Sequence, residues 1–181
     1  VDLELFRPAD RLAARGRLGL PPDRPLIAWI GVDRPEKRLE LARRAVSQLG
    51  RVRAGAELVV VSGVEHREVP HWLAAVDAVL VTSSREGGPL VVKEALACDR
   101  PVVSTDVGDV GEVLAGLAGC AVVPDMDGEA LVGALARSLA AALDAGAVAT
   151  RAAVEPYDIE YHASLTVTSV PARTNCQPVP A

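Results

Sequence analysis

Two glutamates with seven residues between them are the residues best suited to recognise a polar ligand. Gly87 and Gly88 follow Glu86, and Glu94 lies in a run typical of a helix, from Leu90 to Ala97. Free N–H groups at a helix start, preceded by glycines that let a phosphate approach closely, form an anion site. A carboxylate one turn into the helix can accept from two neighbouring hydroxyls. The pattern indicates recognition of a nucleotide carrying a polyhydroxylated group; the alternative is two exposed surface glutamates.

The elements around these glutamates place them at the end of a buried strand. Residues 78–82 form a short branched apolar run, typical of a strand in a parallel sheet. Further strands are expected at 25–31, 56–61, 101–104 and 120–123, and helices at 9–18, 33–49, 71–75, 90–97, from 109, and 128–145. This alternation predicts an α/β fold with a Rossmann-like, doubly wound parallel sheet. The strand-end segments 31–37, 63, 83–90 and 105–109 should then share one edge, where ligands bind.

Cations follow the first expected strand. Arg34, Lys37 and Arg38 lie in the first turn of the next expected helix, for which Asp33 and Glu36 have the spacing of a capping box. Positive charge at a helix N-terminus opposes the helix dipole, and a bound phosphate would remove that conflict. The alternative is that these side chains form a solvated charged face of the helix. This alternative has more weight for Arg38 than for Lys37.

Composition limits the classes of function. The 181 residues are 50% hydrophobic, enough for one domain with a core of Ala, Val and Leu. A net charge of −5 argues against a general nucleic-acid or acidic-membrane binder, so any phosphate site must be local. No apolar run approaches the ~20 residues that cross a bilayer.

Cysteines and histidines show no pattern of a metal site. The odd number of cysteines, without disulfide-like spacing, indicates a reducing compartment and a cytoplasmic location. Cys98 and Cys120 are expected to pack in the interior. The histidines, which have no ligand spacing, are interpreted as incidental. These residues are Cys98, Cys120, Cys176, His66, His71 and His162.

Three stretches together resemble a known family. The block 77–109 (DAVLVTSSREGGPLVVKEALACDRPVVSTDVGD) resembles the donor half of retaining glycosyltransferases with two facing Rossmann domains, the GT-B fold of glycosyltransferase family four. Residues 31–37 (GVDRPEK) resemble that family's phosphate-binding loop, and residues 1–8 (VDLELFRP) the linker into its C-terminal domain. The resemblance covers about residues 1–143 and is to the teichuronic-acid biosynthesis type in particular.

The resemblance implies roles for the residues above. It implies that Glu86 contacts the donor sugar, Glu94 the ribose hydroxyls and Lys37 the diphosphate, with Glu86 and Lys37 as the catalytic residues. The expected nucleotide-sugar site comprises Arg34, Lys37, Glu86, Gly87, Gly88, Leu90, Val91 and Glu94. Neither a cofactor nor a metal is expected, because in this family the leaving phosphate assists the incoming hydroxyl. The donor would be a UDP-sugar or a GDP-sugar.

The sequence also departs from the family pattern. Val32 stands where the family usually has Arg, and Arg34 is a candidate to compensate. Pro89 replaces a common Gly and removes one N–H, and Asp99 replaces a turn Gly, which Asp tolerates with some strain. The segment between residues 63 and 71 is short, and elements that often shape the base pocket are absent from it. The base therefore stays undetermined.

The domain organisation predicted is a linker remnant at 1–8, a nucleotide-sugar-binding domain at 9–147 and a tail of uncertain structure at 148–181, with a weak helix pattern at 157–170. An N-terminal acceptor-binding domain is expected to be missing, so that this chain alone would hold a donor and transfer nothing. Contact with the inner face of a membrane is expected only through that domain. Two alternatives stay open: a stand-alone nucleotide-binding or regulatory module, and half of a sugar-nucleotide epimerase, for which only Glu86 could supply the acid or base.

Overall fold

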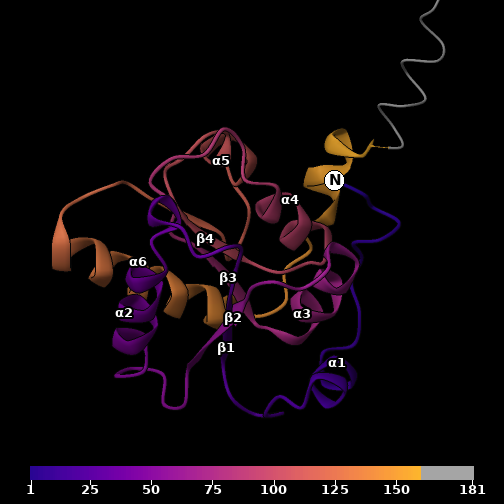
Figure 1. Cartoon of the computed structure of the whole chain (residues 1–181), viewed down its shortest axis with the longest axis horizontal. Helices are drawn as coiled ribbons and strands as arrows, with labels where there is room; N and C mark the ends of the chain where they lie inside the picture. The colour runs from indigo at the N-terminus through magenta and orange to yellow at the C-terminus, as the bar shows by residue number, and fades with distance from the viewer. Residues whose placement is uncertain (160–181) are drawn as a thin grey trace, which may run out of the picture.

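The structure, a computed structural model, describes residues 1–159 (Figure 1). The strands are β1 (Leu26–Ile30), β2 (Glu57–Val61), β3 (Ala78–Val81), β4 (Val102–Thr105) and β5 (Ala121–Val123). The α-helices are α1 (Arg11–Leu18), α2 (Leu39–Leu49), α3 (Val69–Ala75), α4 (Leu90–Ala97), α5 (Val110–Val113) and α6 (Gly128–Ala145). Three short 3-10 helices are η1 (Pro35–Lys37), η2 (His66–Glu68) and η3 (Arg151–Tyr157).

All five strands are parallel and lie in the order β2-β1-β3-β4-β5. The chain enters the sheet at β1, moves outward to β2 and returns on the other side of β1 to form β3. The loops after β1 and β3 therefore leave the sheet toward opposite faces, and the place between them at the carboxyl edge, called the crevice below, is where such sheets bind ligands. This confirms the α/β, doubly wound fold and fixes the place where a ligand should bind.

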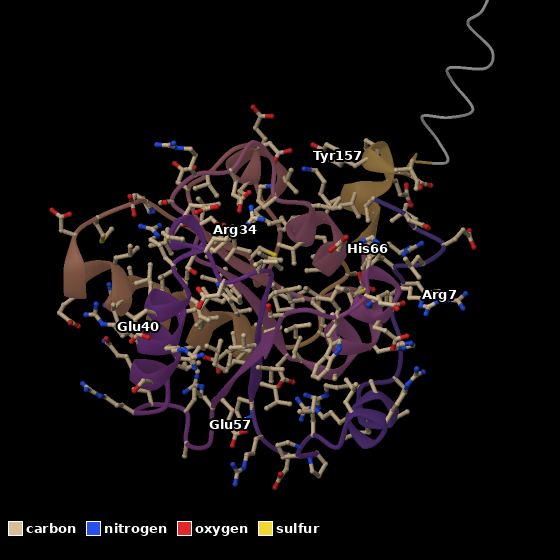
Figure 2. All side chains as sticks on the ribbon, in the orientation of Figure 1. Arg7, Arg34, Glu40, Glu57, His66 and Tyr157 are labelled. Atoms are coloured by element: carbon tan, nitrogen blue, oxygen red, sulfur yellow. The ribbon has the colours of Figure 1, made fainter. Side chains whose placement is uncertain are left out.

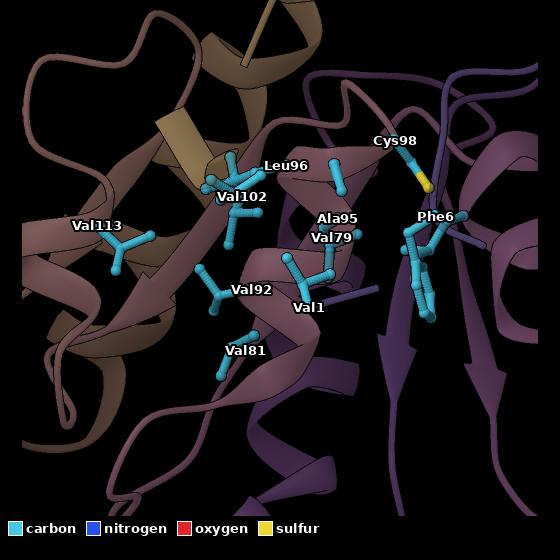
Figure 3. Packing of buried hydrophobic residues seen from close by; sticks show 14 of the residues in the cluster. Val1, Phe6, Val79, Val81, Val92, Ala95, Leu96, Cys98, Val102 and Val113 are labelled. Carbon is cyan, nitrogen blue, oxygen red and sulfur yellow. The ribbon is translucent and has the colours of Figure 1, made fainter. Parts of the chain in front are cut away.

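Helices cover both faces of the sheet, with α2 and α6 on one side and α3 and α4 on the other (Figure 1). Alternate residues of β1 serve the two layers: Ile27 and Trp29 join the core with α2 and α6, while Leu26 and Ala28 join the core with α3, α4 and α5. This alternation follows from the two-residue repeat of a strand. Figure 3 shows the second core, in which Val92 and neighbouring residues of α4 pack on β3 and β4.

The bounds of α4 and α6 are as predicted, but the helix expected at 33–49 is wrong in its first part. Residues 35–37 form η1, and Arg38 then adopts a left-handed backbone with a φ of 50° before α2 begins at Leu39. Neither η1 nor α2 has a side-chain cap hydrogen bond, so Asp33 does not form the expected capping box. Asp109 likewise precedes α5 without a cap bond. In both places the capping pattern in the sequence is overridden by contacts with other loops, which are described below for Arg38 and Asp109.

Both ends of the described chain pack against α4. Residues 1–8 are not extended throughout: residues 2–6 form a turn closed by the Phe6 N–H donating to the Asp2 carbonyl at 2.9 Å, and Phe6 is fully buried. Arg151 donates to the carbonyls of Leu3, Phe6 and Ala97. Residues 151–157, placed in the predicted tail, thus belong to the packed domain. Of the weak helix pattern at 157–170, residues 160–170 lie outside the described residues.

Asp99 adopts the left-handed backbone that its replacement of a turn glycine predicts, with a φ of 54°. Its carboxylate accepts from the backbone N–H groups of Thr150 and Arg151 at 2.8 and 2.9 Å, which offsets the strain. Cys98 is buried, as expected, and burial raises the pKa of its thiol to about 12. Cys120 is half-buried, and Cys176 and His162 lie outside the described residues.

Candidate functional site

The loops after β1 and β3 are tied to one another at the carboxyl edge of the sheet. The Ser84 N–H donates to the Glu36 carbonyl at 2.8 Å, and the Thr82 hydroxyl donates to the Lys37 carbonyl at 2.7 Å. In the other direction, Arg38 Nε donates to the Thr82 carbonyl at 2.6 Å. These bonds bring together residues more than forty positions apart, and they hold the predicted basic loop beside the predicted glycine loop.

Lys37 and Glu86 form an ion pair across these two loops. The Ser83 hydroxyl donates to the same Glu86 oxygen, Oε1, at 2.8 Å. Burial by itself would raise the pKa of Glu86, but the bonds from Lys37 and Ser83 and the charge of Lys37 outweigh it and hold this pKa below its ordinary value. Glu86 is therefore an ionised carboxylate, and both side chains keep some exposure to the crevice, 27% for Lys37 and 18% for Glu86.

The turn after β4 shapes the glycine loop. Gly108 has a φ of 55°, and a Cβ added there would lie 2.5 Å from the Gly87 carbonyl oxygen. A Cβ at Gly88 would meet the Asp109 carboxylate at 3.0 Å, and that carboxylate is paired with the buried Lys93. Gly88 and Gly108 thus allow the two loops to touch, a role that the sequence did not indicate, whereas a Cβ at Gly87 would meet nothing within 4 Å.

Helix α4 presents its N-terminus to the same crevice. Pro89 precedes it without a side-chain cap hydrogen bond, so the first N–H groups, at Leu90 and Val91, keep their capacity to bind an anion. Leu90 is half exposed and Val91 partly buried. The backbone N–H groups of the expected anion site are therefore in place at the start of α4, and Lys37 lies on the neighbouring loop.

Glu94 lies one turn inside α4 and contacts a residue that was interpreted as incidental. Its side chain is only 6% exposed, and its Oε1 lies 2.6 Å from His66 Nε2 (Figure 2 labels His66). Burial raises the pKa of Glu94, and the contact with His66 opposes that rise. The spacing of the histidines along the sequence could not reveal this pair. The one available signal was that His66 follows the carboxyl end of β2, the edge of the sheet at which the other predicted site residues lie.

Arg34 and Arg38, one η1 turn apart, have different surroundings. The side chain of Arg34 is exposed and makes no hydrogen bond or ion pair with any residue in 1–159 (Figure 2). Arg38 instead donates to the carbonyls of Thr82 and Ser83 and to Asp125 at 2.9 Å. Arg38 is thus a structural link, and the solvated face considered for it is wrong. Arg34 stays available to an anion.

A cavity of about 660 Å³ opens at the amino end of the strands, where Arg15 and Arg100 bond the carbonyls that end α3. Those arginines have a structural role, since cations favour a helix C-terminus. In residues 1–159 no cluster of three or more His, Cys, Asp or Glu side chains could bind a metal ion, and no helix has the length and apolar character needed to span a membrane.

Comparison with known proteins identifies the family. The profile of the family described as "Glycosyl transferases group 1" matches residues 26–141, which include both loops of the site. The chain belongs to this glycosyltransferase family. Curated relatives include the D-inositol 3-phosphate glycosyltransferases of Mycobacterium bovis and Mycobacterium tuberculosis, 35% identical over 134 residues. That match covers 60% of this chain but only 28% of each relative, so this glycosyltransferase chain spans less than a third of their length.

Solved structures agree on the fold of this glycosyltransferase domain. The C-terminal domain of the group 1 glycosyltransferase LpcC from Francisella tularensis has a TM-score of 0.65 at 18% identity, covering 88% of this chain and 99% of that one. Anabaena HepE, solved in complex with UDP-glucose, has a TM-score of 0.65 at 17% identity, covering 94% of this chain and 56% of that one. The fold is thus that of the C-terminal, Rossmann-like half of a GT-B glycosyltransferase.

Proposed function

We propose that this chain is the donor-binding half of a retaining glycosyltransferase that transfers a sugar from a UDP-sugar or a GDP-sugar to a hydroxyl acceptor. The observation that carries the proposal is the Lys37–Glu86 pair beside the open N-terminus of α4, with Glu94 buried one turn further along that helix. One cation, free backbone donors and two carboxylates in this order suit a diphosphate that lies between a sugar and a ribose.

Each residue has a distinct part in the proposed site. Lys37 and the first N–H groups of α4 bind the diphosphate, with Arg34 as a second cation at the edge of the crevice. Glu94 accepts from the ribose hydroxyls. Glu86 accepts from hydroxyls of the sugar, and its negative charge lies near the carbon at which positive charge develops.

The transfer itself needs little from this half beyond charge stabilisation. The bond from the sugar carbon to the diphosphate oxygen breaks, and its electron pair stays on the diphosphate. The acceptor oxygen bonds the same carbon on the same face, and its proton passes to the leaving phosphate. Lys37 stabilises the charge that grows on the diphosphate during this step. We propose no metal and no cofactor for it.

The finer assignments belong to the same proposal. Membership of glycosyltransferase family four and a role in building a cell-envelope polysaccharide are supported by the resemblance of residues 77–109. A second, acceptor-binding domain is the expected partner, because GT-B enzymes close their site between two domains. A cytoplasmic location, with membrane contact through that second domain, fits such a role.

Thermal unfolding of the 181-residue chain with UDP, GDP, UDP-glucose and GDP-mannose, each with and without EDTA, tests the proposal. A ligand at 100 times its Kd should stabilise the folded state by ~2.7 kcal/mol. The shift should be the same in EDTA. A folded sample that responds to none of these ligands would contradict the proposed function, and a shift lost in EDTA would contradict binding without a metal.

A further inference from the structure

The contact between His66 and Glu94 joins two elements that meet only through the fold. His66 begins η2, in the short segment after β2, and Glu94 lies in α4; twenty-eight positions separate them. The imidazole Nε2 and the carboxylate Oε1 are 2.6 Å apart. This separation is short for a hydrogen bond between two side chains.

The imidazole is held in place from its other side. The ring centroids of His66 and Phe6 are 5.2 Å apart with planes tilted by 50°, a favourable aromatic geometry. Phe6 is fully buried in the core beside α4, so it provides a fixed surface. The His66 side chain is nevertheless 57% exposed, so its ring lies at the surface of the molecule while it contacts the nearly buried Glu94.

The two oxygens of Glu94 are not equivalent. Oε1 is bound to His66, whereas Oε2 has no hydrogen bond to any residue in 1–159. Among the described residues no fully buried side-chain oxygen lacks a partner, so Oε2 must reach the surface. The other titratable groups that act on this carboxylate are the Val1 amino group and the Cys98 thiol, and neither of these bonds it.

We propose that His66 is a positioning residue of the nucleotide site: it holds Glu94 through Oε1 so that Oε2 faces the ribose hydroxyls of the donor. This inference rests on the proposed function and adds a residue to it. A carboxylate with so little exposure loses most of its hydration, and a fixed donor on one oxygen compensates for that loss while it sets the direction of the other. The short segment after β2 thus contributes to ribose recognition.

Calorimetric affinities test the role of His66. We would measure the full chain, His66→Ala and His66→Gln with UDP or GDP, whichever the wild type binds more tightly, and with its 2′,3′-dideoxy form. His66→Ala should weaken the ribonucleotide roughly three- to tenfold, the effect of losing a modest hydrogen bond. His66→Gln, whose amide nitrogen can take the place of Nε2, should bind within about twofold of wild type. Against the dideoxy nucleotide, all three proteins should bind alike.

A matched control is His71→Ala on α3, since the His71 side chain makes no hydrogen bond or ion pair with any residue in 1–159; it should bind as wild type does. If His66→Ala does not fold, His66→Leu removes the donor while keeping the contact with Phe6. An alanine or leucine variant that binds the ribonucleotide as tightly as wild type would overturn the inference. So would an equal loss for the ribose and dideoxy forms. A wild type that binds neither UDP nor GDP would instead contradict the proposed function itself.

Discussion

The ammonium group of Lys37 lies against the carboxylate of Glu86, although 49 positions of sequence separate the two residues. Ser83 donates to the same oxygen of Glu86, so Glu86 keeps one donor if Lys37 turns to an incoming phosphate. Under the proposed function, Lys37 would leave Glu86 and pair with the diphosphate as the donor binds. Lys37 is the residue on which this exchange depends.

Lys37→Ala should lower the affinity for UDP or GDP roughly ten- to hundredfold, because it removes charge-assisted bonds worth about 1.5–3 kcal/mol. Calorimetry on the full chain measures this directly. Arg43→Ala is the matched control: it removes an equal charge from an exposed position of α2. Equal losses from both substitutions would indicate a diffuse basic surface in place of a defined phosphate site.

The two glutamates should separate sugar binding from nucleotide binding. Glu94→Gln keeps the shape of the side chain but removes its charge, so it should weaken the free nucleotide and the nucleotide sugar alike. Glu86→Gln should leave the free nucleotide unchanged and weaken only the sugar conjugate. Both affinities can be measured by calorimetry. A Glu86→Gln variant that loses as much affinity for the bare nucleotide as Glu94→Gln would show that the roles are assigned wrongly.

Gly108→Ala should damage the glycine loop. An alanine at a φ of 55° is strained by about 1–2 kcal/mol, and its Cβ would in addition meet the Gly87 carbonyl at 2.5 Å. Urea denaturation should show a larger loss of stability than for Gly116→Ala, where φ is 73° but nothing lies within 4 Å of the added Cβ. Nucleotide-sugar affinity should fall only in the Gly108 variant. Similar stability losses in both variants would mean that the loop moves aside at no cost.

The pH dependence of stability should differ in sign for the two glutamates. Burial raises the pKa of Glu94, so the folded chain holds this proton to a higher pH than the unfolded chain, whose glutamates titrate near ~4.3. The contribution of Glu94 to the free energy of unfolding therefore falls as the pH rises from 4 through its folded-state pKa. Glu94→Gln lacks this fall, so it should gain stability relative to wild type between pH 4 and 7.

Glu86 provides the opposite case. Although burial alone would raise its pKa, the bonds from Lys37 and Ser83 hold it below the ordinary value. Its contribution to stability is then present above the unfolded pKa and is lost as the pH falls through the folded one. Glu86→Gln should therefore be less stable than wild type at pH 7 and approach it toward pH 3. Urea denaturation across this range measures both variants, and parallel curves for the two would contradict the assignment.

Local patterns in the sequence determined the class of fold and the position of most elements. The bounds of α4 and α6 follow from glycine and proline at the helix starts and from apolar spacing, which act between near neighbours. The strand at 78–81 follows from a run of branched apolar residues. The alternation of strands and helices then determined a parallel sheet, and the rule for its carboxyl edge indicated where Lys37, Glu86 and Glu94 should gather.

Only the tertiary structure decided which side chains meet there. The left-handed backbone at Arg38, which replaces the expected helix start, is accompanied by bonds from its side chain to the carbonyls of Thr82 and Ser83. The partners of Glu94 and Gly87, namely His66 and Gly108, come from loops after other strands. No repeat or spacing along the chain encodes these pairs, because the order of strands in the sheet, and not the distance in sequence, determines which loops touch.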